Sequence, residues 1–351
     1  MSKFTKVAVL MGGGSSESAI SLKTGAAVLE GLREAGYDAA GVVAAQDDSF
    51  ALPAGTEAVF IALHGAFGED GGAQLALEKL GVPYTGSRPE SARVSFDKIL
   101  SRAAFEAAGV RVPRRIGTGD WGLGTGNAGN GEWGIGNGNI GAARGEVETL
   151  PRAAGNFDTT ACRLVADMQF SVPSPQSPVP FPLVVKPPRQ GSSVGVSIVK
   201  RAEDFSAALA EAAKYDSEIL VEEFIPGREW TVPILGRQVL PIVEITPKGE
   251  WYDDAAKYHS GGSTKYTFPE DDPANAAPAE EARRLALLAF DAVGAWSVGR
   301  VDFRVSPDGV PYVLELNSIP GCTASSLLPK SAAKAGISFP ELCAAIMEDA
   351  R

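Results

Sequence analysis

The stretch that decides the fold class is Val7-Ala8-Val9-Leu10-Met11-Gly12-Gly13-Gly14, which leads into a segment with apolar residues at helical spacing. A short apolar run, a glycine turn and an amphipathic segment predict a strand, a tight turn and a helix. Apolar runs around Gly41-Val43 and Val59-Ala62, with a helix near Gly72-Leu80, continue this alternation to about residue 90. We therefore expect an α/β domain with a doubly wound sheet.

The glycine turn does not carry a standard nucleotide fingerprint. Glu17 stands where the third glycine of GxGxxG would be, and the chain contains no GxxxxGK[ST] motif. A carboxylate at this place suggests binding of a cationic group such as an ammonium; the alternative is a first-turn residue favoured by the helix dipole. His64, one of two histidines, follows a later strand at the same sheet edge. It is either a ligand-binding residue or one that fixes its own loop.

Composition bounds the class of protein. With 351 residues the chain exceeds what one core usually serves, and 44% apolar residues are ample for two or three domains. A formal charge of −11 argues against a nucleic-acid partner and fits a small-molecule substrate. The three cysteines are widely spaced, so neither a disulfide framework nor a zinc site is indicated.

The N-terminal apolar run is too short for a signal peptide, and no stretch is long enough to span a bilayer. We therefore expect a cytoplasmic protein with no membrane partner.

The rest of the chain predicts two further regions. A helix over 97–110 precedes a strand-rich region with strands near 182–186, 194–199, 219–224, 229–235 and 239–243 and a helix over 203–214. A helix over 279–293, a hairpin over 299–317 and two short helices after Ser325 complete the chain.

Between these regions lies a segment that does not read as folded. Trp121-Gly-Leu-Gly-Thr-Gly-Asn127 recurs as Trp133-Gly-Ile-Gly-Asn-Gly-Asn139, and glycine at this density makes ordering costly in backbone entropy. We expect a mobile surface insertion, followed by an extended proline-rich tether at 173–180.

Two stretches of the middle region suggest a nucleotide site. In Lys186-Pro-Pro-Arg-Gln-Gly-Ser-Ser-Val-Gly195 a lysine ends a strand before a loop of small residues, whose backbone N–H groups can cradle phosphate oxygens. An ordinary hairpin loop is the competing interpretation. Downstream, the strand edge at Glu222-Glu223-Phe224 could pair with an adenine and Glu229 with ribose hydroxyls, although isolated glutamates are more often solvated.

The hairpin carries the chemistry. In Gly299-Arg-Val-Asp-Phe-Arg-Val305 and Tyr312-Val-Leu-Glu-Leu-Asn317, strand alternation places Val301, Phe303, Val305, Tyr312, Leu314 and Leu316 toward the core and Arg300, Asp302, Glu315 and Asn317 on the other face. Three oxygen donors beside an arginine suit Mg²⁺ and a transferring phosphoryl group. The alternatives are a solvated polar face and a bulge at Gly309 that shifts the register by one residue.

Taken together, these residues resemble the D-alanine–D-alanine ligases of the ATP-grasp superfamily over most of the chain. The matching stretches, in order and with similar spacing, are 9–13 with Ser15, Glu17 and Ser21; 63–71; 83–87; 97–98; 185–195; 256–258; and 315–321. Only residues 117–180 lie largely outside the pattern.

The resemblance implies an α/β protein, α+β overall, with an ATP-grasp fold in three domains. These would be a Rossmann-like substrate-binding domain (1–96), a central domain (97–224) containing the insertion at about 117–160 and the tether, and a C-terminal catalytic domain (225–351). A lid loop would cover about 255–267. A homodimer is what the family suggests.

The resemblance also implies roles for residues. ATP would be held by Lys98, Lys186, Ser193, Glu222, Glu223, Phe224, Glu229 and Lys257, and Mg²⁺ by Asp302, Glu315 and Asn317, with two ions expected and Mn²⁺ as a substitute. The first substrate's ammonium would bind Glu17, in a network with Ser192 and Tyr258 that closes the lid. Arg300 and the N–H of Gly321 would stabilise the oxyanion, and His64, Ser326 and Leu327 would line the substrate site.

The expected reaction is ATP-dependent ligation of two D-alanine molecules, through an acyl phosphate, for peptidoglycan precursor and cell-wall synthesis. Two alternatives stay open: a sister ligase that uses D-lactate or D-serine as second substrate, and a non-catalytic protein that binds ATP or an amino acid.

Overall fold

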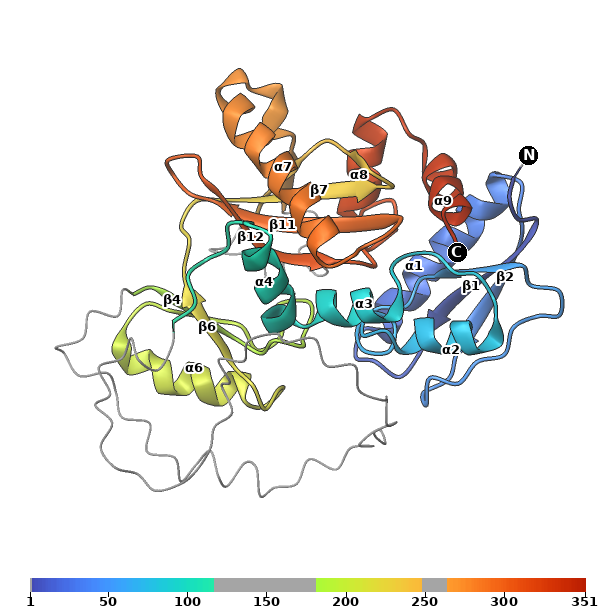
Figure 1. The fold of residues 1–351 in the computed structure, drawn as a ribbon, viewed down its shortest axis with the longest axis horizontal. Helices are drawn as coiled ribbons and strands as arrows, with labels where there is room; N and C mark the ends of the chain where they lie inside the picture. The colour runs from blue at the N-terminus through green and yellow to red at the C-terminus, as the bar shows by residue number, and fades with distance from the viewer. Residues whose placement is uncertain (1, 117–180, 248–263) are drawn as a thin grey trace.

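The computed structural model describes residues 2–116, 181–247 and 264–351 (Figure 1). The described strands form three sheets, and the described N- and C-terminal residues lie near each other. The insertion, the tether, Lys257, Tyr258 and most of the predicted lid lie outside the described residues.

The first sheet is the predicted α/β unit. Its order is β2-β1-β3, with all neighbours parallel. The elements are β1 (Lys6–Gly12), α1 (Ser18–Glu34), β2 (Asp38–Ala44), β3 (Ala58–Ile61) and α2 (Gly72–Leu80). Strand β1 is buried along nearly its whole length because helices cover both faces of a doubly wound sheet.

Two helices connect this unit to the rest of the molecule: α3 (Pro89–Phe96) and α4 (Lys98–Ala107). The Asp97 side chain caps α4 by accepting hydrogen bonds from the N–H groups of Ile99 and Leu100. Helix α4 was predicted and α3 was not, because α3 buries little beyond Ala92 and Ser95 and so lacks an apolar stripe.

The second sheet is antiparallel with the order β5-β4-β6, and α6 covers one face (Figure 1). Its elements are β4 (Leu183–Lys186), β5 (Ser197–Val199), the short 3₁₀ helix η2 (Ala202–Asp204), α6 (Phe205–Ala212) and β6 (Leu220–Glu223). The core between sheet and helix contains Leu183, Val185, Phe205 and Leu209.

The third sheet has the order β10-β9-β7-β11-β12, with β8 paired to β7. Helix α7 packs on the apolar face of this sheet. Its elements are β7 (Arg228–Leu235), β8 (Gln238–Val239), β9 (Val243–Thr246), β10 (Lys265–Thr267), η4 (Pro269–Asp271), η5 (Pro273–Asn275), α7 (Ala276–Ala292), β11 (Val298–Val305) and β12 (Pro311–Asn317).

The hairpin β11–β12 has its predicted turn at 306–309 but not its predicted alternation throughout. The register runs from Arg300 opposite Asn317 to Asp302 opposite Glu315 and then shifts, so that Phe303 faces Val313. Leu314 is the extra residue of a β-bulge. The prediction that Tyr312 and Leu314 are core residues was therefore wrong, and Val313 is buried instead.

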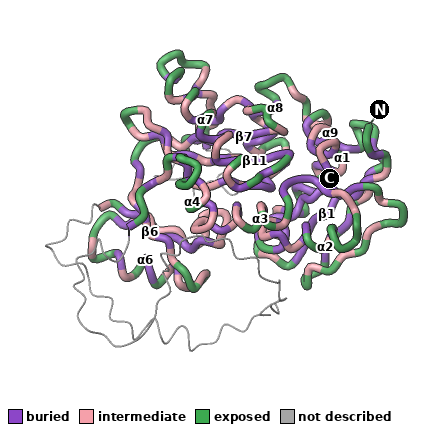
Figure 2. Tube along the Cα trace, in the orientation of Figure 1, coloured by how far each residue is buried: buried purple, intermediate pink, exposed green. Residues whose placement is uncertain are grey.

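The C-terminal helices α8 (Leu327–Lys334) and α9 (Phe339–Glu348) return the chain to the first unit, where α9 packs on α1 (Figures 1 and 2). The two helices can approach this closely because Gly31 has no side chain. A Cβ at Gly31 would lie 2.9 Å from the Phe339 ring and 3.0 Å from Cys343 Sγ. Among the described helices, none combines the length and the apolarity that crossing a bilayer requires.

Candidate active site

The polar face of β11 and β12 brings together the four residues predicted to share it. Arg300 donates from Nε and Nη2 to the two oxygens of Asp302, at 2.9 and 2.7 Å. Thr231, opposite Asp302 on β7, donates from its hydroxyl to Asp302 Oδ1 at 2.5 Å. Asp302 is thus held in a fixed orientation by a bidentate guanidinium and a hydroxyl.

Lys98 reaches this face from the start of α4. Its ammonium lies 2.9 Å from Glu315 Oε2 and donates to the carbonyl oxygen of Gln190 at 2.8 Å. Burial lowers the pKa of Lys98, but the nearby carboxylates, chiefly Glu315, outweigh it and raise the pKa above its ordinary value. Lys98 therefore stays charged and links α4, the hairpin and the loop after β4.

The donor set of Asp302, Glu315 and Asn317 fits a hard cation. Two carboxylates and an amide oxygen sit on adjacent strands, and Asn317 Oδ1 is oriented by the N–H of Ile319 at 3.0 Å. Within the described ranges no group of three His, Cys, Asp or Glu forms a metal cluster. A cation here would need further oxygen ligands, which phosphate groups supply.

The loop after β4 has a turn-like backbone. Ser192, Ser193 and Gly195 all have positive φ, at 50°, 62° and 70°. Turns can bring successive N–H groups to one side, an arrangement that binds phosphate oxygens. The N–H of Lys98 donates to the carbonyl of Pro188 at 3.1 Å, so the loop also contacts α4.

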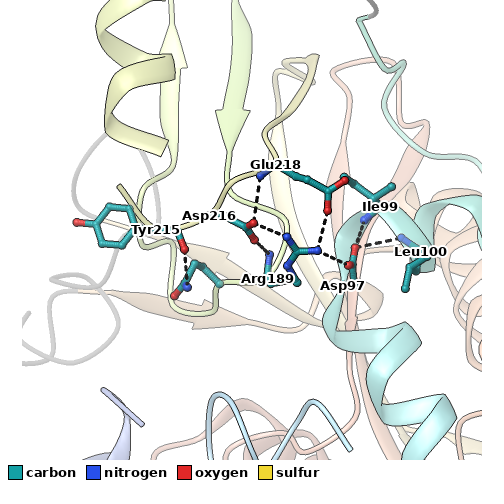
Figure 3. A network of polar contacts seen from close by, with 8 residues as sticks. Asp97, Ile99, Leu100, Arg189, Tyr215, Asp216 and Glu218 are labelled. Carbon is teal, nitrogen blue, oxygen red and sulfur yellow. Dashed lines mark hydrogen bonds and ion pairs between the residues drawn. The ribbon is translucent and has the colours of Figure 1, made fainter. Parts of the chain in front are cut away.

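Arg189 anchors this loop through three carboxylates (Figure 3). It contacts Asp216, Glu218 at 2.7 Å and Asp97 at 3.3 Å. Asp97 is also the cap of α4, so a single guanidinium ties the loop to the helix that presents Lys98. No local sequence pattern indicates this role for Arg189, because its carboxylate partners are 92 residues upstream and about 27 downstream.

Glu17 lies at the start of α1 and meets the same loop. Ser192 donates from Oγ to Glu17 Oε1 at 2.5 Å. Glycines make room for this carboxylate: a Cβ at Gly65 or Gly191 would lie 3.0 or 3.2 Å from Glu17 Oε2. The structure therefore joins the glycine turn of the first unit to the small-residue loop of the second.

His64 is buried, with 6% of its surface exposed. Its Nε2 lies 3.0 Å from Thr24 Oγ1, its Nδ1 lies 3.5 Å from Glu69 Oε1, and its carbonyl accepts from Ser15 at 2.6 Å. These contacts match the interpretation in which His64 fixes its loop.

Lys186 of β4 and Glu222 of the neighbouring strand β6 form a buried ion pair. Arg102 of α4 completes it, with Nη1 3.3 Å from Glu222 Oε2. Arg102 was missed in the sequence, although it follows Lys98 at the helical spacing of four residues. Both residues thus project toward the same side of α4.

The remaining nucleotide candidates lie in and on either side of the connection from β6 to β7. Glu223 accepts from the N–H of Arg114 at 2.8 Å, and the N–H of Phe224 donates to Pro182 at 3.1 Å. Glu229 lies 3.6 Å from Arg304, directly opposite it in the register of β7 and β11.

The last candidates lie where β12 runs into α8. Ser326 is the cap residue of α8, and its Oγ lies 2.9 Å from Thr323 Oγ1 and accepts from the N–H of Thr323 at 3.1 Å. A Cβ at Gly321 would lie 3.2 Å from Ser326 Oγ, and Leu327 is buried behind them.

Comparison with known proteins accounts for this arrangement. The family model described as D-ala D-ala ligase C-terminus matches residues 165–348. The D-alanine–D-alanine ligase of Anaeromyxobacter sp. strain Fw109-5 is 39% identical over 358 residues, covering 100% of this chain and 99% of that protein. The chain belongs to the D-alanine–D-alanine ligase family.

Further relatives agree. The D-alanine–D-alanine ligase of Alkalilimnicola ehrlichii is 40% identical over 347 residues and covers 99% of this chain and 94% of its own length. The crystal structure of the Bacillus anthracis ligase complexed with ATP has a TM-score of 0.69 at 30% identity, covering 99% of this chain and 97% of that one. The three described sheets and their helices are accordingly an ATP-grasp fold with an N-terminal α/β unit, as predicted.

Proposed function

We propose that this protein joins two D-alanine molecules into D-alanyl-D-alanine, with conversion of ATP to ADP and phosphate, for peptidoglycan precursor synthesis. The observation that carries the proposal is the convergence of three structural units: the oxygen donors of the β11–β12 hairpin, the small-residue loop after β4 and Glu17 of the N-terminal unit meet through Lys98 and Ser192. Membership of the ligase family supports the same activity.

ATP would lie between the second and third sheets. The adenine and ribose would contact the β6–β7 connection and Glu229, with Glu222 and Glu223 at the strand edge. The phosphates would lie against Ser193 and the loop N–H groups, with Lys98, Lys186 and Lys257 supplying positive charge.

Asp302, Glu315 and Asn317 would hold Mg²⁺, or Mn²⁺ in its place, with two ions expected. When bound, the cation would neutralise charge on the phosphate oxygens. Thr231 and Arg300 keep Asp302 oriented for this role.

The protein's own residues would direct both chemical steps. Glu17 would bind the ammonium of the first D-alanine. This would place the carboxylate of that D-alanine to attack the γ-phosphorus of ATP, which yields an acyl phosphate and ADP. The amine of the second D-alanine then attacks the acyl carbon, the new C–N bond forms, and phosphate leaves with the C–O bonding electrons. Arg300 and the N–H of Gly321 would stabilise the oxyanion between these events.

The second substrate would bind beside the start of α8. The Ser326 hydroxyl would receive its carboxylate next to the backbone N–H groups of the helix start, and Leu327 would bound the pocket. His64 would support the substrate side of the site, and Tyr258 would join Ser192 and Glu17 in closing the lid. A tyrosine in the lid favours an amine over D-lactate as the second substrate.

We also propose the three-domain division at 1–96, 97–224 and 225–351, a homodimer as the assembly, and the cytoplasm as the location, where ATP is available.

One assay tests the proposal. Purified protein is supplied with ATP, Mg²⁺ and D-alanine, alone or with D-serine or D-lactate; phosphate release is followed and products are identified by mass. We expect phosphate release that requires D-alanine and a product with the mass of the dipeptide. A depsipeptide as the main product would favour the sister ligase, and no D-alanine-dependent release would refute the proposal.

A further inference from the structure

Arg304 lies on the site face of β11, and none of the roles proposed above uses it. The strand alternates, so that Val301, Phe303 and Val305 are buried while Arg300, Asp302 and Arg304 share the opposite face. Only 17% of the Arg304 side chain is exposed. A largely desolvated guanidinium beside a candidate nucleotide site calls for a specific role.

The guanidinium is committed to the backbone of one short segment. Its Nε donates to the carbonyl oxygen of Ile225 at 3.1 Å, and its Nη2 donates to that of Gly227 at 2.8 Å. Both acceptors belong to the β6–β7 connection, residues 224–227, which joins the second sheet to the third. Two donors in a rigid fork fix the orientation of two peptide groups at once.

Two further contacts come from Phe224, at the start of the connection, and from Glu229, in β7 just after it. The guanidinium lies over the ring of Phe224, 5.4 Å from its centroid, and Nη1 lies 3.6 Å from Glu229 Oε2. Burial lowers the pKa of Arg304, and the charge of Glu229 partly opposes this.

The backbone at the end of the connection, at Gly227, is also held by a contact that does not involve the Arg304 side chain. Gly227 has φ of 116°, and a Cβ there would lie only 2.1 Å from the carbonyl oxygen of Val305. The connection therefore lies directly against the end of β11, and only glycine permits this contact. Arg304 and Gly227 together seat the connection on the hairpin that carries the cation ligands.

We propose that Arg304 is a positioning residue for the nucleotide. By holding the β6–β7 connection, it keeps the base-binding edge at Phe224 and the ribose-binding Glu229 at a fixed place relative to Asp302. The inference rests on the proposed function, because it assigns the nucleotide to this connection.

The proposal predicts a division between kinetic constants. Without the two hydrogen bonds from Arg304, the connection becomes ordered only when the nucleotide binds. The free energy of this ordering then weakens the affinity for the nucleotide. The residues proposed for acyl transfer and for the second substrate, Arg300, Gly321 and Ser326, are untouched. The KM for D-alanine and the rate of the chemical step should therefore stay unchanged.

The test compares Arg304→Met, which keeps length and contact with Phe224 but removes all donors, with Arg304→Lys, which keeps charge but not the fork. Arg284→Met is the matched control, because Arg284 is an exposed arginine of α7 paired with Glu281. For each protein, KM for ATP, KM for D-alanine and kcat are measured, and ADP binding is measured by calorimetry.

For Arg304→Met we expect KM for ATP and the Kd for ADP to rise about tenfold, with KM for D-alanine and kcat within about threefold of the parent. Arg304→Lys should lie between the parent and Arg304→Met, and Arg284→Met should match the parent. If the ATP constants stay within twofold, or all constants worsen together in both Arg304 variants, the proposal is overturned.

Calorimetry separates this proposal from the proposed function. The ligase activity is refuted if the parent protein shows no D-alanine-dependent phosphate release. A higher Kd for ADP in Arg304→Met than in the parent would still support the positioning role.

Discussion

Ser192 donates a hydrogen bond from its hydroxyl to Glu17 Oε1 at 2.5 Å, across 175 residues of sequence. Ser192 belongs to the loop after β4, and Glu17 begins the first helix of the N-terminal unit. A bond to a carboxylate is stronger than one between neutral groups. This contact therefore couples the phosphate side of the site to the residue proposed to bind the substrate ammonium.

We predict that Ser192→Ala raises KM for D-alanine about tenfold. A charge-assisted hydrogen bond contributes about 1.5–3 kcal/mol, and each 1.4 kcal/mol corresponds to a factor of ten. Steady-state kinetics at saturating ATP measure the effect. Ser49→Ala is the control, because Ser49 also donates to a carboxylate, that of Asp47, but at an exposed turn. Equal kinetics for both variants would show that the Ser192–Glu17 bond does not position the substrate.

We predict that Glu315→Gln and Asp302→Asn each lower kcat by three or more orders of magnitude while leaving the fold intact. Each change replaces a negatively charged cation ligand by a neutral amide on a strand face that tolerates polar residues, and weakening the metal clamp in this way costs several kcal/mol in the transition state. Phosphate release and circular dichroism check both parts. Asp308→Asn, in the exposed turn of the same hairpin, should retain activity. Turnover within a few-fold of the parent in either ligand variant would contradict the cation assignment.

The hairpin shows how far sequence reasoning reaches. Strand alternation brought Arg300, Asp302, Glu315 and Asn317 to one face, because the bulge lies beyond Glu315 and leaves that part of the register intact. It failed at Tyr312 and Leu314, since a bulge in mid-strand has no marker in an apolar sequence. The turn at 306–309 was predictable because Pro and Gly have restricted or special backbone preferences.

Contacts between distant elements were beyond the sequence. Arg102 with Glu222 and Arg189 with Asp97 are set by the docking of α4 against the second sheet, which no local pattern encodes. The fork of Arg304 on the β6–β7 connection is hidden for the same reason. Family resemblance supplied candidate roles, whereas the structure supplied the partners that orient those residues.

We predict that Glu222→Gln destabilises the protein by about 3–5 kcal/mol, because it leaves Lys186 and Arg102 as buried cations without their shared counter-charge. Urea unfolding measures the change. Glu211→Gln is the control: Glu211 pairs with Lys214 on the exposed face of the same unit, where such a pair contributes at most about 1 kcal/mol. If the two variants unfold at the same urea concentration, the buried pair does not stabilise the fold.

The last prediction concerns pH and the junction of the two chain ends. Glu348 of α9 accepts hydrogen bonds from Tyr37 at 2.5 Å, from Ser2 at 2.7 Å and from the N–H of Lys3 at 2.9 Å. Burial raises the pKa of Glu348, but these hydrogen bonds and the charge of Lys3 together lower it below its ordinary value of 4.5. Ionised Glu348 therefore stabilises the folded state.

Because the folded pKa is depressed, this stabilisation is present in full above the unfolded pKa and is lost as pH falls through the folded value. Glu348→Gln should therefore lower the free energy of unfolding by about 1 kcal/mol at pH 7. The difference from the parent should begin to shrink as pH falls below 4.5 and should be lost once pH falls through the lower folded pKa, where the carboxylate of the folded parent becomes protonated. Unfolding of both proteins between pH 3 and 8 measures this, with Glu30→Gln, an exposed change on α1, as control. A difference that grows toward acid pH would mean that Glu348 is held in its protonated form, and the junction would then be stabilised by its packing alone.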